Sequence, residues 1–254
     1  ILFIFFLFII GCGPVKSAAG ETHTSAIDGM VQIFIPEGYF TMGSVMDDLQ
    51  ADEDEKPAHQ VFLNSFWIDR TEVTNEMYLR CISAQVCTLP ARSTYYSKPD
   101  YASHPVIGVS WVQAQEYCQW TGRRLPTEAE WEKAARGTDD RIYPWGNDPP
   151  NSELANFNHQ VNETTQVGTY AKGTSPYGVL DMAGNAWEWV ADGYQPDFYS
   201  RSPEENPVSD SPVNQRVIRG GNWDSNEEGI RVTNRFWAFP GRNDTDGFRC
   251  AKSD

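Results

Sequence analysis

The sequence predicts a single compact α+β domain rich in loops, and three observations support this fold class. The 254 residues include nine Trp and 13% aromatic residues overall, which is more rigid apolar surface than a disordered or coiled-coil chain carries. The 20 Gly and 16 Pro indicate many turns. Short apolar runs and three capped helical segments occur without an internal repeat or a low-complexity tract. We therefore expect one domain over residues 31–254.

The first part of this domain has the pattern of short strands. Apolar side chains are concentrated in residues 31–35, 60–63 and 66–68, each of strand length. The stretch 47–55 is strongly acidic, and we expect a solvated loop there rather than a metal site.

Three helices are predicted from their capping residues. The first begins at Thr71 or Thr74 and runs to about residue 83. The second and third, over residues 110–120 and 127–136, both open with the Ser/Thr-x-x-Gln/Glu spacing of a capping box. Beyond Gly137 we expect turns and short strands.

The charge of the chain limits its partners. The net charge is −15, and the acidic residues are spread through the sequence. Binding to a phosphate backbone requires Lys and Arg side chains that displace counterions. We therefore expect no nucleic-acid partner.

The N-terminus differs from the rest of the chain. Residues 1–10 form an unbroken apolar run, which is too short for a bilayer span of about 20 residues. The run ends in Gly11-Cys12 and resembles a bacterial lipoprotein signal, in which the Cys is lipidated. We expect residues 1–12 to be a signal segment, residues 13–30 a polar tether, and the protein to be exported and membrane-anchored in the cell envelope. An ordinary cleaved signal with a chance Cys is the alternative.

The cysteines then predict two disulfides. If Cys12 is lipidated, four of the five cysteines remain, an even number for an exported chain. Cys81 and Cys87 are close enough to form a local bridge, which leaves Cys118 to pair with Cys250. Free buried thiols are the alternative.

Nine segments resemble the formylglycine-generating enzyme, or sulfatase-modifying factor, family. In chain order they are residues 40–43 (FTMG), 66–75 (FWIDRTEVTN), 104–106 (HPV), 124–132 (RLPTEAEWE), 143–146 (YPWG), 177–178 (YG), 181–189 (DMAGNAWEW), 219–221 (RGG) and 247–250 (GFRC). The resemblance covers about residues 31–252. It implies a compact fold akin to C-type lectins and places Cys118 and Cys250 where the family has a disulfide.

The resemblance also implies a copper site that this sequence cannot complete. Aerobic family enzymes oxidise a Cys of a sulfatase to formylglycine with O₂ and a Cu(I) ion held by two Cys thiolates. The corresponding positions here are Ser225 and Ile230. Because Ser offers no thiolate and Ile no ligand atom, we expect no copper and no catalytic residues at these positions.

Iron chemistry is not favoured either. The family resembles sulfoxide synthases that bind iron through histidines, but His23, His59, His104 and His159 lack the spacing of a metal site. Calcium is the metal that the resemblance supports. Asp181, Gly184, Ala186 and Glu188 match one family calcium site, and Asn156 and Phe157 match the start of a second, whose later Asp we cannot find. A turn held by Asx-type hydrogen bonds is the alternative for residues 181–188.

Motif position also implies a ligand groove. Trp187, Trp223, Phe236 and Trp237 lie near the family's substrate groove, and we also assign Asn222, Arg231 and Arg235 to it, while Arg249 next to Cys250 is expected to be structural. The remaining Trp residues, with Trp187, are expected to fill the core.

These expectations lead to a functional hypothesis. The protein is expected to be a membrane-anchored, non-catalytic binding or assembly module whose groove holds a protein, peptide or glycan. The alternatives are an oxidoreductase of the formylglycine-generating type with divergent ligands, and a structural lipoprotein of a surface machine.

Overall fold

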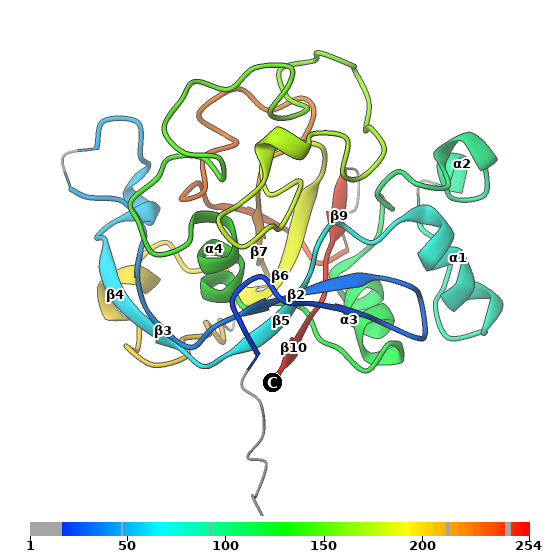
Figure 1. The fold of residues 1–254 in the computed structure, drawn as a ribbon, viewed down its shortest axis with the longest axis horizontal. Coiled ribbons are helices and arrows are strands. Elements are labelled where there is room, and N and C mark those ends of the chain that lie inside the picture. Colours follow the sequence, from blue (N-terminus) through cyan, green and yellow to red (C-terminus); the bar gives the residue numbers. More distant parts are fainter. Residues whose placement is uncertain (1–16, 47, 92, 212–213, 242–244) are drawn as a thin grey trace, which may run out of the picture.

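The computed structural model describes residues 17–46, 48–91, 93–211, 214–241 and 245–254 (Figure 1). The predicted signal segment with Cys12 lies outside these ranges, as do Asp47 of the acidic stretch and Arg242. Within them, the helices are all too short or too polar to cross a bilayer.

Short strands outnumber helices in the described ranges. The strands are β1 (Thr22–Thr24), β2 (Val31–Ile35), β3 (Gly38–Met42), β4 (His59–Leu63), β5 (Phe66–Asp69), β6 (Trp187–Gly193), β7 (Arg216–Arg219), β8 (Phe236–Ala238), β9 (Asp246–Phe248) and β10 (Ala251–Ser253). The α-helices are α1 (Asn75–Ser83), α2 (Ser93–Tyr96), α3 (Trp111–Trp120) and α4 (Glu128–Arg136), and the 3₁₀ helices are η1 (Glu53–Glu55), η2 (Pro99–Tyr101), η3 (Ala171–Gly173) and η4 (Phe198–Arg201). The α+β class is confirmed.

The three predicted helices are confirmed, and their caps explain where they begin. Thr74, Ser110 and Thr127 are the N-caps of α1, α3 and α4, and each side chain accepts a backbone N–H of the first turn. Both expected capping boxes are present. Strand β3 was not predicted because its sequence, GYFTM, begins with glycine and lacks a run of β-branched residues.

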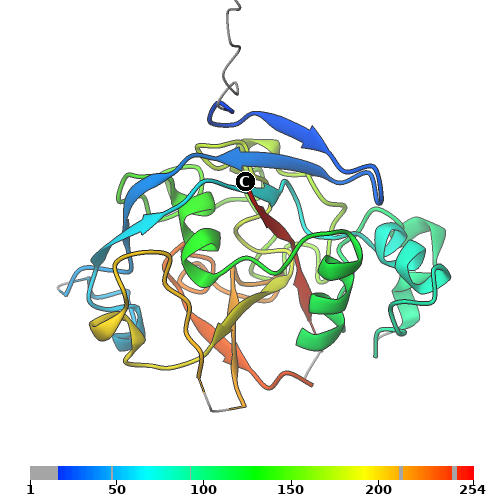
Figure 2. The same cartoon turned by 90° about the horizontal axis from the view of Figure 1, so that it is seen from below.

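Two four-stranded sheets and one hairpin form the framework. The first sheet has the order β1-β2-β5-β10, the second β8-β7-β6-β9, and β3 pairs with β4. The last strands of the chain are therefore placed next to much earlier ones, with β10 antiparallel to β5 and β9 parallel to β6. Figure 2 shows β1 and β2 at one side of the molecule and β7 and β8 at the opposite side.

Helix α4 lies between the hairpin and the second sheet and is buried along its whole length. Its charged side chains are therefore paired. Glu128 binds Arg219 and Arg235, while the Lys133 Nζ donates to the carbonyls of Pro36 and Gly38 at 2.8 Å each. Burial without such partners would cost several kcal/mol per charge. This helix ties the N-terminal and C-terminal halves together through ion pairs.

Residues 17–30, expected to belong to a tether, are folded against the domain. Thr22–Thr24 pair with β2, and Asp28 is 1% exposed and bound to Arg123. A polar composition was a poor guide here because the backbone of β1 supplies the contacts and Asp28 meets a buried guanidinium. The domain thus begins no later than residue 17.

The acidic stretch is only partly a solvated loop. Glu53 is exposed, but Glu55 is fully buried and its two oxygens accept hydrogen bonds from Arg231 at 2.7 and 2.8 Å. The expectation of a solvated loop is wrong at Glu55, because a guanidinium 176 positions later in the chain compensates its charge.

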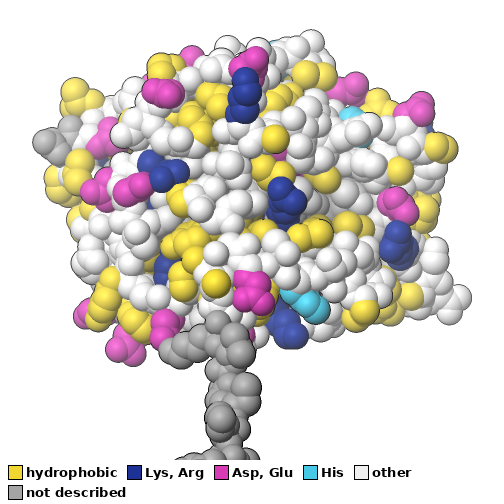
Figure 3. Space-filling view, viewed as in Figure 1, with side chains coloured by type: hydrophobic (Ala, Val, Ile, Leu, Met, Phe, Trp, Pro, Cys, Tyr) yellow, Lys and Arg dark blue, Asp and Glu magenta, His cyan; other side chains and the backbone are white. Residues whose placement is uncertain are grey.

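Both predicted disulfides are confirmed, Cys81–Cys87 and Cys118–Cys250. Of the tryptophans expected in the core, Trp131 and Trp189 are fully buried, whereas Trp111, Trp120, Trp145 and Trp187 are only partly buried. Arg249 is fully buried and paired with Glu188, which confirms its structural role. On the face shown in Figure 3, acidic and basic side chains are interspersed.

Candidate functional site

The loop after β7 carries Ser225. Gly220 and Gly221 both have positive φ, and a Cβ at Gly221 would lie 2.7 Å from the Gly229 carbonyl oxygen. The chain then turns so that the Ser225 Oγ donates to the Asn222 Oδ1 at 2.9 Å and accepts from the Asn222 N–H at 3.0 Å. The Ser225 hydroxyl is therefore used to close its own loop.

Ile230 is fully buried, and its neighbours are apolar. It belongs to a cluster with Tyr143, Ala155, Phe157 and Ala183, against which Trp145 packs. Four of the five cysteines are in the described residues, and all four are in disulfides. Hydrocarbon thus surrounds the position where the family resemblance implies a thiolate.

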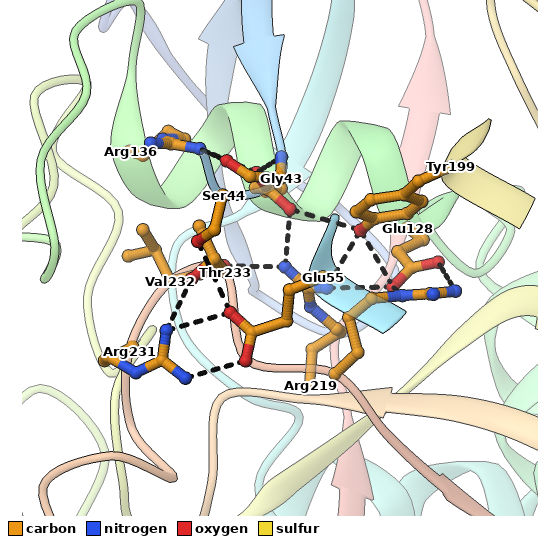
Figure 4. A network of polar contacts seen from close by, with 12 residues as sticks. Gly43, Ser44, Glu55, Glu128, Arg136, Tyr199, Arg219, Arg231, Val232 and Thr233 are labelled. Atoms are coloured by element: carbon orange, nitrogen blue, oxygen red, sulfur yellow. Dashed lines mark hydrogen bonds and ion pairs between the residues drawn. The ribbon is translucent and has the colours of Figure 1, made fainter. Parts of the chain in front are cut away.

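A buried network of ion pairs lies beneath these two positions in the chain (Figure 4). The Arg219 guanidinium contacts Glu128 at 2.8 Å and Glu132 at 2.7 Å, and the Tyr199 hydroxyl contacts both carboxylates. Desolvation opposes ionisation of Glu128, but the adjacent Arg235 and Arg219 hold its pKa below the usual value. These groups are matched to one another and do not face solvent.

Arg231 and Arg235, assigned to the groove, are 3% and 2% exposed. Arg231 is paired with Glu55 and Arg235 with Glu128. Their placement in an open groove is wrong, because the acidic residues of η1 and α4 neutralise them inside the molecule. Arg231 does line a separate cavity of about 230 Å³, together with Arg136 and Arg141.

The aromatic residues of the expected groove fall into two groups. Trp187, Phe236, Trp237 and Phe239 form what we call the aromatic strip: their ring centroids follow one another at 5.7, 6.3 and 5.6 Å. Trp187 and Phe236 also line a hollow of about 140 Å³. Trp223 instead packs on the His159 ring at 5.5 Å, next to the buried Asn222.

The two segments expected to bind calcium are brought side by side. Asn156 forms a β-bridge with Gly184, and the Asn185 N–H donates to the Asn156 carbonyl at 2.8 Å. Gly184 is required here because a Cβ would lie 2.2 Å from that carbonyl oxygen. Asn156 is fully buried, and its Oδ1 has no hydrogen-bond partner among the described residues.

The carboxylates of this region lie in unequal surroundings. Both oxygens of Glu188 accept from Arg249 at 2.6 Å, and one also accepts from the Trp131 Nε1 at 2.8 Å. Asp181 accepts from the Gly168 N–H at 2.6 Å, and burial raises its pKa. Glu188 is thus engaged by a cation of the protein, while Asp181 is not paired with one in the contacts described.

Glu72 joins this cluster, and the sequence analysis missed it. It is fully buried; one oxygen accepts from Asn185 at 2.9 Å, and the other has no hydrogen-bond partner in the described ranges. Burial, followed by the charges of Asp181 and Glu188, raises its pKa well above the usual value. No sequence signal identified it, because 108 positions separate it from Asp181, counted as 181 − 72 − 1.

These donors fit a hard cation. Three buried carboxylates share one guanidinium, and carboxylate and amide oxygens without partners are what Ca²⁺ prefers. In the described parts of the chain no group of three or more His, Cys, Asp or Glu side chains is arranged to hold a metal ion, so backbone carbonyls would have to contribute. The histidines are dispersed: His23 contacts Trp67, His59 Tyr199, and His104 Tyr101.

Comparison with known proteins identifies relatives along the whole domain. A family model described as the sulfatase-modifying factor enzyme 1-like domain matches residues 16–254. A formylglycine-generating enzyme of Streptomyces coelicolor is 31% identical over 94% of this chain and 95% of its own length. The serine/threonine-protein kinase pkn1 of Chlamydia caviae is 39% identical over 87% of this chain, which spans only 37% of that relative.

Solved structures agree with the fold. The structure of PvdO from Pseudomonas aeruginosa superimposes with a TM-score of 0.81 at 26% identity, over 94% of this chain and all of that one. Treponema denticola variable protein 1, at 22% identity and a TM-score of 0.74, shares the fold over 92% of this chain.

Proposed function

This chain belongs to the sulfatase-modifying factor family, and from that premise we propose that it is a non-catalytic binding or assembly module of an exported, lipid-anchored protein. The observation that carries the proposal is the environment of Ile230. A fully buried isoleucine in an aromatic and aliphatic cluster leaves no ligand atom at one copper position. A hydroxyl in a closed loop stands at the other.

The chemistry explains why these substitutions matter. Cu(I) is selected by soft sulfur ligands, and a serine oxygen is hard. Because Cys81, Cys87, Cys118 and Cys250 are joined in disulfides, none of them offers a thiolate in their place. The family fold remains as a scaffold, and its function then rests on surfaces rather than on a metal-bound thiolate.

The test is a direct assay of copper binding and oxidation. The purified domain is titrated with Cu(I) and incubated with O₂ and a Cys-containing sulfatase peptide, and the peptide mass is measured. We expect no tight copper binding and no formylglycine. The Ser225→Cys/Ile230→Cys variant shows whether copper binding returns when both thiolates are restored. Formylglycine formed by the unchanged chain would reject the proposal in favour of an oxidoreductase with divergent ligands.

We also propose that the module binds calcium for stability. Glu72 and Asp181 would supply carboxylate oxygens, Asn156 an amide oxygen, and Gly184, Ala186 and Phe157 backbone carbonyls. Glu188 remains part of the predicted set, although Arg249 occupies both of its oxygens. A bound cation would neutralise the excess negative charge buried between the two loops.

A further inference from the structure

We propose that the outer edge of β8 is a docking site for an extended, basic segment of a partner protein, which joins the sheet as a strand next to β8. The inference rests on the proposed binding function and names its ligand class. Its elements are an open strand edge, the aromatic strip and a hollow beside them.

The edge of β8 is open. In the sheet order β8-β7-β6-β9, β8 is an outermost strand. Within the described residues, the backbone of Phe236, Trp237 and Ala238 makes no hydrogen bond outside its pairing with β7. Unpaired N–H and C=O groups along a strand edge form a template for another strand. The edge ends at Pro240, whose carbonyl accepts the Trp111 N–H at 3.0 Å.

The aromatic strip gives this short edge the apolar surface that a bound segment needs. Phe236 is 54% exposed and Phe239 50% exposed, although both are large apolar side chains. Trp187 and Trp237 are half-buried between them and hold the rings in stacked or edge-on contact. Contiguous exposed aromatic surface of this kind marks interaction sites. Three residues of main-chain pairing alone would bind weakly, so the rings must contribute.

The hollow next to the edge provides a place for one side chain. Its volume is about 140 Å³, and Trp187 of β6, Ile218 of β7 and Ala238 of β8 line it, so it lies over strands of the same sheet. Alternate side chains of an added strand point to the same face. In strand addition, main-chain hydrogen bonds supply affinity and such hollows supply specificity.

The charge of the molecule selects the occupant. A second copy would bring together two chains of net charge −15, which repel. A basic segment is attracted instead, and its Lys or Arg side chains interact favourably with the faces of Trp and Phe rings. The site also faces the right way for an anchored protein, since β8 lies at the opposite side from β1 (Figure 2). Five residues from Cys12 to Ser17 reach at most about 17 Å, so the β1 side would stay near the membrane.

The test is a peptide selection, in which the surface itself chooses its ligand. A displayed library of random decapeptides is panned on the purified domain and counter-selected on the Phe236→Lys/Phe239→Lys variant, since lysines block strand edges. Leu89→Lys, at an exposed leucine elsewhere, is the matched control. If the double variant does not fold, as judged by its thermal transition, Phe239→Lys alone replaces it.

We expect basic peptides that bind the wild type and Leu89→Lys equally, bind the edge variant at least tenfold more weakly, and lose at least tenfold in affinity when alternate amides are N-methylated. Recovery of no peptide that discriminates the edge variant overturns the proposal. So do binders indifferent to N-methylation, acidic binders, or a dimer in sedimentation that the edge variant abolishes. The copper and formylglycine assay does not involve β8, so failure there rejects the proposed function without changing the result of this selection.

Discussion

Ile230 shows at the residue scale how an expected ligand position becomes part of the core. We predict that Ile230→Ala lowers the free energy of unfolding by about 2–5 kcal/mol, because the change removes buried methyl groups and leaves a cavity. Leu89→Ala, at a side chain that is 53% exposed, should change it by less than about 0.5 kcal/mol. Urea unfolding with the disulfides intact measures both. Equal losses in the two variants would mean that Ile230 is not packed as described.

Asp192 gives a pH dependence at the same scale. Burial, with the charge of Glu128 nearby, raises its pKa from 3.8 to about 7. Between these pH values the folded state binds a proton that the unfolded chain has released, so stability falls as pH rises through this window. We predict that wild type loses up to about 1.4 kcal/mol per pH unit relative to Asp192→Asn. Urea unfolding at pH 5 and pH 7 measures this, and an unchanged difference between the two proteins would contradict it.

Helix η1 converts part of an acidic loop into a structural element. We predict that Glu55→Gln costs about 3–5 kcal/mol of folding free energy, because it leaves the Arg231 guanidinium buried without its charge partner. Glu53→Gln is the matched control in the same turn, since the Glu53 side chain is 89% exposed, and it should cost less than about 1 kcal/mol. Thermal unfolding of both variants distinguishes them, and similar losses would argue against a special role for Glu55.

The paired loops that contain Asn156 and Asp181 make a prediction about calcium. We expect 1 mM Ca²⁺ to raise the Tm by a few degrees over EDTA, since an ion that binds only the folded state stabilises it by mass action. Asp181→Asn should abolish this increase. Asp139→Asn, on an exposed carboxylate paired with Arg141, should retain it. An identical wild-type Tm in Ca²⁺ and EDTA would show that the excess charge is neutralised by protons alone.

At the scale of the whole molecule, the Cys118–Cys250 disulfide joins α3 to the last strands. Its partners are 132 positions apart, against 6 for Cys81–Cys87. The chain-entropy relation gives roughly 5 kcal/mol for the long loop and roughly 2 kcal/mol for the short one. We therefore predict a larger loss of stability in Cys118→Ala/Cys250→Ala than in Cys81→Ala/Cys87→Ala. The reverse order in urea unfolding would contradict this.

Local features of the fold were readable in the sequence. The boundaries of α1, α3 and α4 follow from Thr74, Ser110 and Thr127, because a cap depends on residues within one turn. Strands β2 and β5 follow from their apolar runs. The two disulfides follow from the count and spacing of the cysteines. The absence of thiolates at positions 225 and 230 needs no structure at all, since it is a matter of residue identity.

Only the tertiary structure decided where charge is buried and which surfaces remain open. Glu55, Glu72, Arg231 and Arg235 have the composition of a solvated surface, yet each is buried because a partner far along the chain meets it. The pairing of β1 and the open edge of β8 were equally hidden, since strand neighbours are set by the path of the whole chain. Sequence patterns report interactions within a few residues, whereas burial and ion pairing depend on contacts across more than one hundred.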